Sequence, residues 1–255
     1  MTNVGSNTVY DKFVPADWVP LRADPEKDTV LAVGSLLAFW PVYYLNSTQS
    51  SPVLDALWIV GIVGLCVLAP AYYVVRHRGK GFAAVGLTTV GWHRALLVSG
   101  ILAGVFGLEF FFEPPVSTSA LAIHIATVAV MFWEPFFVYG WLQLRFERAF
   151  GTAAGIILAA AGFALFHVGV LGMAGLAGVV VIGIFQGVLF WYFDRSILVL
   201  WPLYWAIAST QGTIDREVFS VGDLLLHALA LGLTGAGLLW LARNRRNGDQ
   251  SEQRH

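Results

Sequence analysis

Eight long apolar windows constrain what this chain can fold into more than any other feature of its sequence. A helix rises about 1.5 Å per residue and satisfies its own backbone, so roughly 17 to 25 apolar residues can cross the hydrocarbon layer of a membrane. The windows span residues 29–45, 54–75, 95–112, 119–142, 153–173, 175–193, 196–211 and 222–242. We therefore predict an all-α fold, a polytopic transmembrane bundle of about eight spans.

The composition agrees with a membrane protein. Charged residues make up 12% of the 255 positions and hydrophobic residues 57%, and the mean hydropathy is +0.70. A soluble domain is typically about 25% charged, so a water-soluble fold of this chain would lack surface charge. The formal net charge of −1 gives no reason to expect nucleic acid as a partner. Cys66 is the only cysteine, so no disulfide can form within the chain.

Basic residues gather in alternate connections between the windows. Four Lys or Arg residues lie at 76–94, two at 145–148 and three at 243–246, whereas the connections at 46–52 and 113–118 contain none and only Arg216 departs from the pattern. Because positive charges favour the cytoplasmic side, we predict that both termini are cytoplasmic. We divide the chain into a polar or interfacial segment (1–28), a transmembrane domain (29–242) and a polar tail (243–255). The first residues do not resemble a signal peptide, so we expect the N-terminal segment to be retained.

Two ionisable residues lie at similar depth inside neighbouring windows. Glu134 is in the fourth window and His167 in the fifth. An ionisable group in a membrane is costly unless it is paired or faces a cavity, so each marks a candidate site. A carboxylate beside an imidazole suits general-base activation of water. Equally, the two could simply bond each other, or bond backbone groups freed by Pro135.

Other polar residues favour structural roles. We expect His124 to serve a structural or lipid-headgroup role, His227 to be a partly wet structural histidine, and Glu109 and Glu113 to lie at the outer interface. The histidines lack the close spacing of a dedicated metal site and no phosphate loop is present, so we predict no metal and no cofactor. Glycines at Gly175-x-x-Gly178 and Gly183-x-x-x-Gly187 are typical of close helix packing.

The sequence around the Glu134 and His167 pair resembles a known family. The run EPFFVYGWLQLRFERAFG at 134–151, followed by Phe163-x-x-x-His167, resembles the CAAX prenyl protease and bacteriocin-processing (CPBP, or Abi) family of intramembrane endopeptidases. The segments 86–96 and 194–202 resemble parts of the same family, so the likeness covers about residues 80 to 210. It implies an integral, multi-pass protein, which we expect in a prokaryotic cell membrane. The implied partners are membrane lipids and a lipophilic, prenylated or transmembrane peptide.

Three motif positions depart from the family pattern of Glu-Glu-x-x-x-Arg, Phe-x-x-x-His and His-x-x-x-Asn. Pro135 replaces the second glutamate, Tyr139 replaces the arginine, and 203–210 offers neither histidine nor asparagine for the third motif. The resemblance implies that Glu134 activates water and that His167 helps to position it. We expect Phe163, Tyr139 and Tyr204 to contact the substrate. A substitute for the third motif, which would stabilise an oxyanion, could come from one of four residues, Tyr204, Ser209, Thr210 or Gln211.

Three hypotheses follow. The first is a divergent membrane-embedded hydrolase, an endopeptidase or a related enzyme on a lipophilic substrate, that uses Glu134 and His167. The second is a catalytically silent relative that binds a membrane partner or lipid in the inherited cavity. Loss of three motif positions favours the second, whereas retention of two costly buried groups favours the first. A proton-coupled transporter ranks last, because the sequence lacks two similar halves with interrupted spans.

Overall fold

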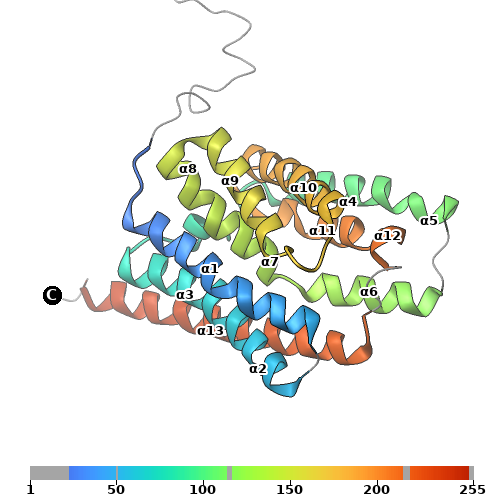
Figure 1. The fold of residues 1–255 in the computed structure, drawn as a ribbon. Helices are drawn as coiled ribbons and strands as arrows, with labels where there is room; N and C mark the ends of the chain where they lie inside the picture. The colour runs from blue at the N-terminus through green and yellow to red at the C-terminus, as the bar shows by residue number, and fades with distance from the viewer. Residues whose placement is uncertain (1–22, 50, 114–116, 215–218, 253–255) are drawn as a thin grey trace, which may run out of the picture.

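A computed structural model describes residues 23–49, 51–113, 117–214 and 219–252, and it is a bundle of helices (Figure 1). Those residues contain no β-strand, which confirms the predicted all-α, polytopic fold. Residues 1–22 and 253–255, which belong to the two predicted terminal segments, lie outside the described ranges.

Within the described residues, six helical stretches are long and apolar enough to cross a membrane. They are α1 (Lys27–Thr48); α2 (Pro52–Val60), η3 (Gly61–Leu68), α3 (Ala69–Tyr72) and η4 (Tyr73–His77) in succession; α4 (Trp92–Gly107) with α5 (Glu109–Phe112); α6 (Thr118–Val130), α7 (Trp133–Pro135), η6 (Phe136–Gln143) and α8 (Leu144–Phe150) in succession; α10 (Met173–Tyr192); and α13 (Val221–Glu252). The shorter elements are η5 (Phe82–Val85), α9 (Thr152–Leu165), η7 (Ile197–Val199), α11 (Trp201–Ala208) and α12 (Gln211–Ile214).

The fifth and seventh predicted windows form helices that are too short to count as spans by length. Helix α9 has 14 residues and α11 has 8. The fifth window was expected to continue to residue 173, but α9 ends at Leu165 and a tight turn follows, in which Gly169 has φ +91°. That backbone conformation favours glycine and cannot continue a helix. The count of eight spans is therefore not confirmed.

Both predicted terminal segments contain helical residues. Helix α1 begins at Lys27, so Asp28, the last residue of the predicted N-terminal segment, belongs to a helix and is 2% exposed. Helix α13 continues beyond residue 242 to Glu252, so most of the predicted polar tail extends the last helix. A helix can continue from the membrane into water because it satisfies its own backbone hydrogen bonds in both.

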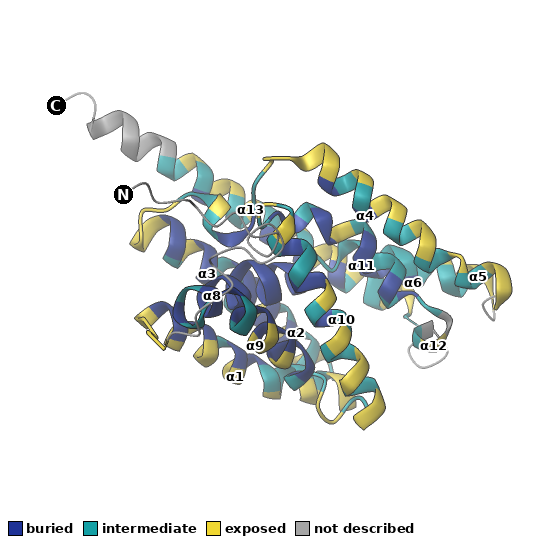
Figure 2. Cartoon of the chain, turned by 90° about the horizontal axis from the view of Figure 1, so that it is seen from above, coloured by how far each residue is buried: buried dark blue, intermediate teal, exposed yellow. Residues whose placement is uncertain are grey.

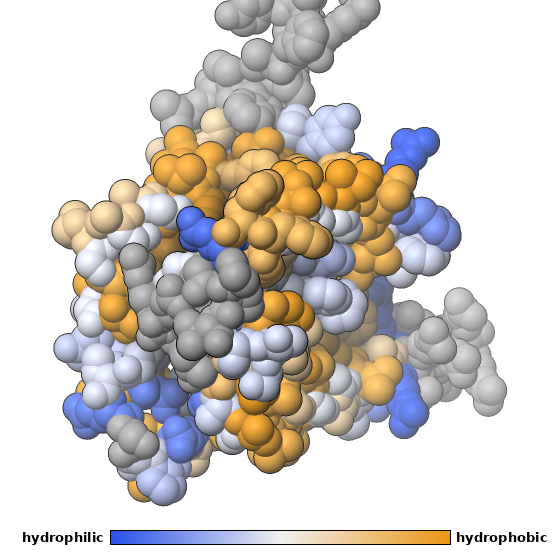
Figure 3. Space-filling model, turned by 90° about the vertical axis from the view of Figure 1, so that its right-hand side faces the viewer, coloured by the Kyte–Doolittle hydropathy of each residue, from blue (hydrophilic) through white to orange (hydrophobic). Residues whose placement is uncertain are grey.

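Apolar side chains cover much of the exterior, and several polar side chains lie inside. Leu97, Ile101 and Val105 on α4 are each more than half exposed, whereas Arg145 in α8 is 1% exposed. Figure 3 shows apolar residues over much of one face, and Figure 2 shows that the most buried helices, including α8 and α9, lie in the middle of the bundle. A lipid-facing surface explains this distribution, because lipid tails solvate apolar side chains.

Glycines let α9 and α10 approach closely, as predicted for Gly183 and Gly187. A Cβ atom on Gly183 would lie 3.0 Å from Cβ of Ala160 on α9, and one on Gly187 would lie 3.0 Å from Cγ2 of Ile156, also on α9. The same prediction is wrong for Gly178, where a Cβ would meet nothing within 4 Å, and for Gly175, where it would meet only Leu171 in the preceding turn. Both of these glycines line a cavity instead.

The fourth predicted span is interrupted beside Glu134. Helix α6 ends at Val130, Met131 has ψ 51°, and the helix restarts with α7 at Trp133. Pro135 is tolerated there because the first turn of a helix has no intrahelical acceptor for its N–H groups, so the missing donor costs nothing. The restart places Glu134 in the first turn of the new helical stretch, beside the break.

Candidate active site

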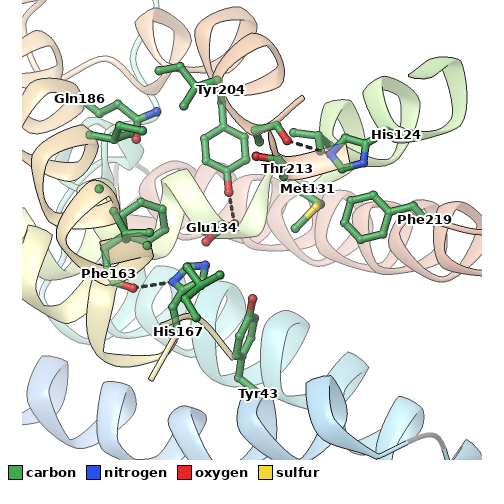
Figure 4. Close-up of a pocket in the computed structure, with 18 residues that line it drawn as sticks. Tyr43, His124, Met131, Glu134, Phe163, His167, Gln186, Tyr204, Thr213 and Phe219 are labelled. Carbon is green, nitrogen blue, oxygen red and sulfur yellow. Dashed lines mark hydrogen bonds between the residues drawn. The ribbon is translucent and has the colours of Figure 1, made fainter. Parts of the chain in front are cut away.

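A cavity of about 260 Å³ lies between α6, α7, α9, α10 and α11 (Figure 4). One part of its wall is apolar and another carries polar side chains. The polar lining residues are Tyr43, His124, Glu134, His167, Gln186, Tyr204 and Thr213; the remaining lining residues are Val128, Met131, Phe163, Leu171, Gly175, Gly178, Val179, Ile182, Ile207, Ala208 and Phe219. A cavity with a few convergent polar groups on an apolar wall is typical of a small-molecule or catalytic site.

Glu134 reaches this cavity from the interrupted helix. Its side chain is buried, with the residue 3% exposed, and one carboxylate oxygen accepts a hydrogen bond from the hydroxyl of Tyr204 on α11. Figure 4 shows Tyr204 above Glu134 and His167 below it. A hydrogen bond to a buried carboxylate stabilises its charged form and restricts its rotation. Tyr204 therefore orients the carboxylate at the cavity wall.

His167 lies in the turn after α9 and not inside the helix, contrary to the sequence-based expectation. Its Nδ1 lies 2.8 Å from the carbonyl oxygen of Phe163. A carbonyl oxygen can only accept, so Nδ1 donates, and in a neutral ring Nε2 then keeps its lone pair. The ring stacks on Phe166 with 4.8 Å between centroids. Packing and the backbone hydrogen bond thus fix an imidazole whose second nitrogen can accept a proton or bind water.

Four of the five predicted site residues meet at this cavity. Glu134, His167, Phe163 and Tyr204 all line it, although they come from α7, α9, α11 and the turn after α9. The fifth, Tyr139, is 1% exposed and is not among the lining residues. Its hydroxyl donates to Oε1 of Gln186 at 2.6 Å. Tyr139 therefore stands one layer behind the cavity wall, because η6 turns it toward α10.

The candidate substitutes for the third motif differ in whether they line the cavity. Of the four, Tyr204 lines the cavity and bonds Glu134. Ser209 is buried but is not a lining residue, and Thr210 forms a hydrogen bond with Thr213 at 3.1 Å between their hydroxyl oxygens. The side chain of Gln211 lies outside the described part of the structure.

Two polar lining residues, His124 and Gln186, stand out among those that the sequence does not indicate. His124 was assigned a structural or lipid role, yet it lines the cavity, with Nε2 2.8 Å from the carbonyl oxygen of Ala208. Gln186 is not ionisable, so the rule that a charge inside an apolar window marks a site does not point to it. A neutral amide inside an apolar helix also indicates a candidate site, although less strongly than a charge does, because its polar atoms too need hydrogen-bond partners in a membrane.

The other ionisable residues discussed above lie away from the cavity wall. His227 is 7% exposed, so it is not partly wet as expected; its Nδ1 lies 2.8 Å from the carbonyl oxygen of Asp223, and its ring packs on Trp58. Glu109 lies in α5 and Glu113 follows that helix. Among the residues that the structure describes, no group of three or more His, Cys, Asp or Glu side chains is arranged to hold a metal ion.

The fold and the cavity together define a multi-pass membrane protein with a polar pocket among its helices. The family described as "Type II CAAX prenyl endopeptidase Rce1-like" matches residues 115–210. This match supports membership of the chain in the CPBP family, which the sequence motifs indicated, and it suggests a CAAX protease-type membrane endopeptidase. The match is shorter than the resemblance at residues 80 to 210, but it includes Glu134, Phe163, His167 and Tyr204. No curated protein and no solved structure matches the chain.

Proposed function

We propose that this protein is an intramembrane endopeptidase in which Glu134 activates a water molecule and His167 helps to position it. The proposal rests mainly on one observation: Glu134, held by Tyr204, and His167, held by the Phe163 carbonyl, line the same cavity. Both groups are oriented by neighbours, and holding reacting groups in place is a large part of enzymatic rate enhancement. Tyr204 acts here by orienting the carboxylate.

The chemistry needs one carboxylate and one water. Glu134 removes a proton from the water as its oxygen attacks the scissile carbonyl carbon, and it returns that proton to the leaving amine. His167 has a lone pair on Nε2 that accepts a hydrogen bond from the same water and so fixes its direction of attack. No other co-reactant is needed for peptide hydrolysis.

The apolar wall of the cavity supports a lipophilic substrate. Val179 and Ile182 on α10 line it together with Phe163 on α9, and Gly178 adds no side chain to the wall. Burial of a lipid group or an apolar peptide segment against such a surface is favourable because it removes apolar area from water. We propose a prenylated or transmembrane peptide as substrate, in a prokaryotic cell membrane.

One observation favours a second candidate, a silent relative that binds a membrane partner or lipid. Three motif positions are changed, and Tyr139, at the position of the motif arginine, is not among the residues that line the cavity. Such a protein would keep the cavity and bind the same class of ligand without hydrolysing it. The two candidates differ in one measurable outcome, which is cleavage.

The test uses the full chain reconstituted in liposomes with a farnesylated peptide and, separately, a transmembrane peptide. We expect wild-type cleavage, and a fall of about 10²- to 10⁴-fold in Glu134→Gln because the general base is lost. His167→Ala should fall less. His227→Ala is the matched control, since His227 is also buried and bonded to a backbone carbonyl but lies away from the cavity.

Thermal unfolding first shows that each variant is folded. Cleavage rates are then compared per amount of folded protein. Binding of either peptide without cleavage would support the silent relative. Equal cleavage by wild type and Glu134→Gln would overturn the proposed role of Glu134.

A further inference from the structure

Gln186 presents a hydrogen-bond donor that nothing in the described part of the protein uses. It lies in α10, is fully buried, and lines the cavity. Its Oε1 accepts the hydroxyl proton of Tyr139 at 2.6 Å, whereas its Nε2 is buried and has no hydrogen-bond partner among the described residues. Figure 4 shows Gln186 on the same side of Glu134 as Tyr204, with its amide at the cavity.

An unsatisfied buried donor is unusual, since most buried polar groups in proteins are hydrogen-bonded. Tyr139 determines which end of the amide is unsatisfied. A phenol that donates to Oε1 holds that oxygen away from the cavity side, so the two N–H groups of Nε2 remain for another acceptor. If the amide exchanged its ends, the Tyr139 oxygen would accept from Nε2 and the buried hydroxyl proton would lose its acceptor, which is costly. The pair is therefore a fixed donor at the wall of the cavity.

We propose that Nε2 of Gln186 donates a hydrogen bond to the scissile carbonyl oxygen of the bound peptide, and that Tyr139 is its positioning residue. This inference rests on the proposed function. It supplies the oxyanion donor that the third family motif would provide, and it does so from α10 rather than from the segment at 203–210. The Tyr139 and Gln186 pair also gives a role to the tyrosine that stands in place of the motif arginine.

The donor acts in the first half of hydrolysis. The water oxygen forms a bond to the carbonyl carbon, Glu134 takes the water proton, and the carbonyl π electrons move to the carbonyl oxygen, whose negative charge the Gln186 N–H groups stabilise. When the C=O bond forms again, the C–N bond breaks and the amine leaves with the proton from Glu134. A donor at a developing oxyanion in a water-poor site acts mainly on the transition state.

Alternative donors are less suitable. The Tyr204 hydroxyl already donates to Glu134, and a phenol has a single proton to donate. Ser209 has a buried hydroxyl oxygen without a partner among the described residues, but it is not a lining residue.

The test compares the kcat and KM of three variants in liposomes, with the farnesylated peptide as probe. Gln186→Met keeps the approximate volume and removes the donor, so kcat should fall about 10²- to 10³-fold with little change in KM. Tyr139→Phe removes the positioning bond, so kcat should fall less, and the double variant should be no slower than Gln186→Met alone. Such non-additivity is expected only if the two residues act as a unit.

Gln143→Met is the matched control. Gln143 is a second buried glutamine, but its Nε2 donates to Glu147 and to the Gly187 carbonyl away from the cavity. We expect its loss to lower the melting temperature and leave kcat unchanged. Gln186→Met should also lower the melting temperature, because the buried Tyr139 hydroxyl loses its acceptor, but it alone should lower kcat as well. If the wild type cleaves and Glu134→Gln does not, but Gln186→Met keeps the wild-type kcat, this inference is wrong and the proposed function stands. If the wild type cleaves neither peptide, both are wrong.

Discussion

Two buried carboxylates in this bundle have very different surroundings. Asp28, at the start of α1, contacts three guanidinium groups, those of Arg145 at 3.3 Å and of Arg78 and Arg148 at 3.7 Å each. The hydroxyl of Tyr73 also donates to it, at 2.7 Å. Glu134 accepts a hydrogen bond from a neutral phenol, that of Tyr204, and lines a cavity. Burial is equal, at 2% and 3% exposure, so burial alone does not distinguish them.

The difference lies in what each carboxylate can still reach. Asp28 is surrounded by its four partners. Because these partners come from η4, from α8 and from the loop after η4, Asp28 links these elements to α1. Arg145, its closest cationic partner, also stacks over Trp141 with 4.9 Å from the guanidinium carbon to the ring centroid. Glu134 faces space in which a ligand fits. A charge enclosed by opposite charges favours a structural role, and a charge at a cavity favours chemistry.

The largest expected effect on stability is therefore at Asp28. Asp28→Asn leaves three guanidinium groups without their shared carboxylate, and removal of one partner of a buried ion pair typically costs about 3 to 5 kcal/mol. Equilibrium unfolding in mixed detergent micelles measures this loss. Glu26→Gln is the control, because the Glu26 pair with Arg78 is half exposed and should be worth less than about 1 kcal/mol.

Glu134→Gln should show the opposite pattern to Asp28→Asn. We expect unchanged or slightly higher stability with loss of cleavage, whereas Asp28→Asn should keep the cleavage rate per folded molecule. Groups that serve function are often not optimal for stability. A loss of several kcal/mol in Glu134→Gln would mean that both carboxylates are structural.

A smaller effect is expected at Tyr204, the partner of Glu134. Tyr204→Phe removes a donor from a buried carboxylate, and such a loss costs about 1 to 3 kcal/mol of unfolding free energy. In a Glu134→Gln background, the same substitution should cost about 1 kcal/mol or less, because a hydrogen bond to a neutral amide is weaker than one to a carboxylate. Equal losses in the two backgrounds would show that Tyr204 stabilises the protein by packing alone.

The sequence predicts the fold class, and it indicates four residues that line the cavity, because both depend on strong local signals. Long apolar windows predict helices through their length, and Glu134 and His167 stand out because charge is rare in them. Phe163 follows from the second motif, whereas Tyr204 is one of four candidates for the third motif among which the sequence does not choose. The enclosure of Asp28 could not be predicted, since its partners are 45 to 120 residues away in the chain.

The local details that the sequence did not give arise from packing. The end of α9 at Leu165 depends on a turn of seven residues that is apolar except for His167, so hydropathy does not mark it. The position of Tyr139 behind Gln186 depends on how η6 faces α10. Whether a glycine packs against a neighbouring helix or borders a cavity also depends on which helix lies opposite, and spacing alone gave the same prediction for Gly178 and Gly183.

The smallest expected effect compares these two glycines of α10. Alanine gains about 1 kcal/mol of helix propensity over glycine at either position. At Gly183 the new Cβ would lie 3.0 Å from Cβ and 3.1 Å from Cα of Ala160, and overpacking of this kind costs about 1 to 3 kcal/mol. At Gly178 the Cβ meets nothing within 4 Å. The unfolding free energies of Gly178→Ala and Gly183→Ala should therefore differ by about 1 to 3 kcal/mol. Because the gain in helix propensity is the same for both variants, the difference measures the packing of α10 against α9. Similar values for both variants would contradict the close packing of Gly183 against α9.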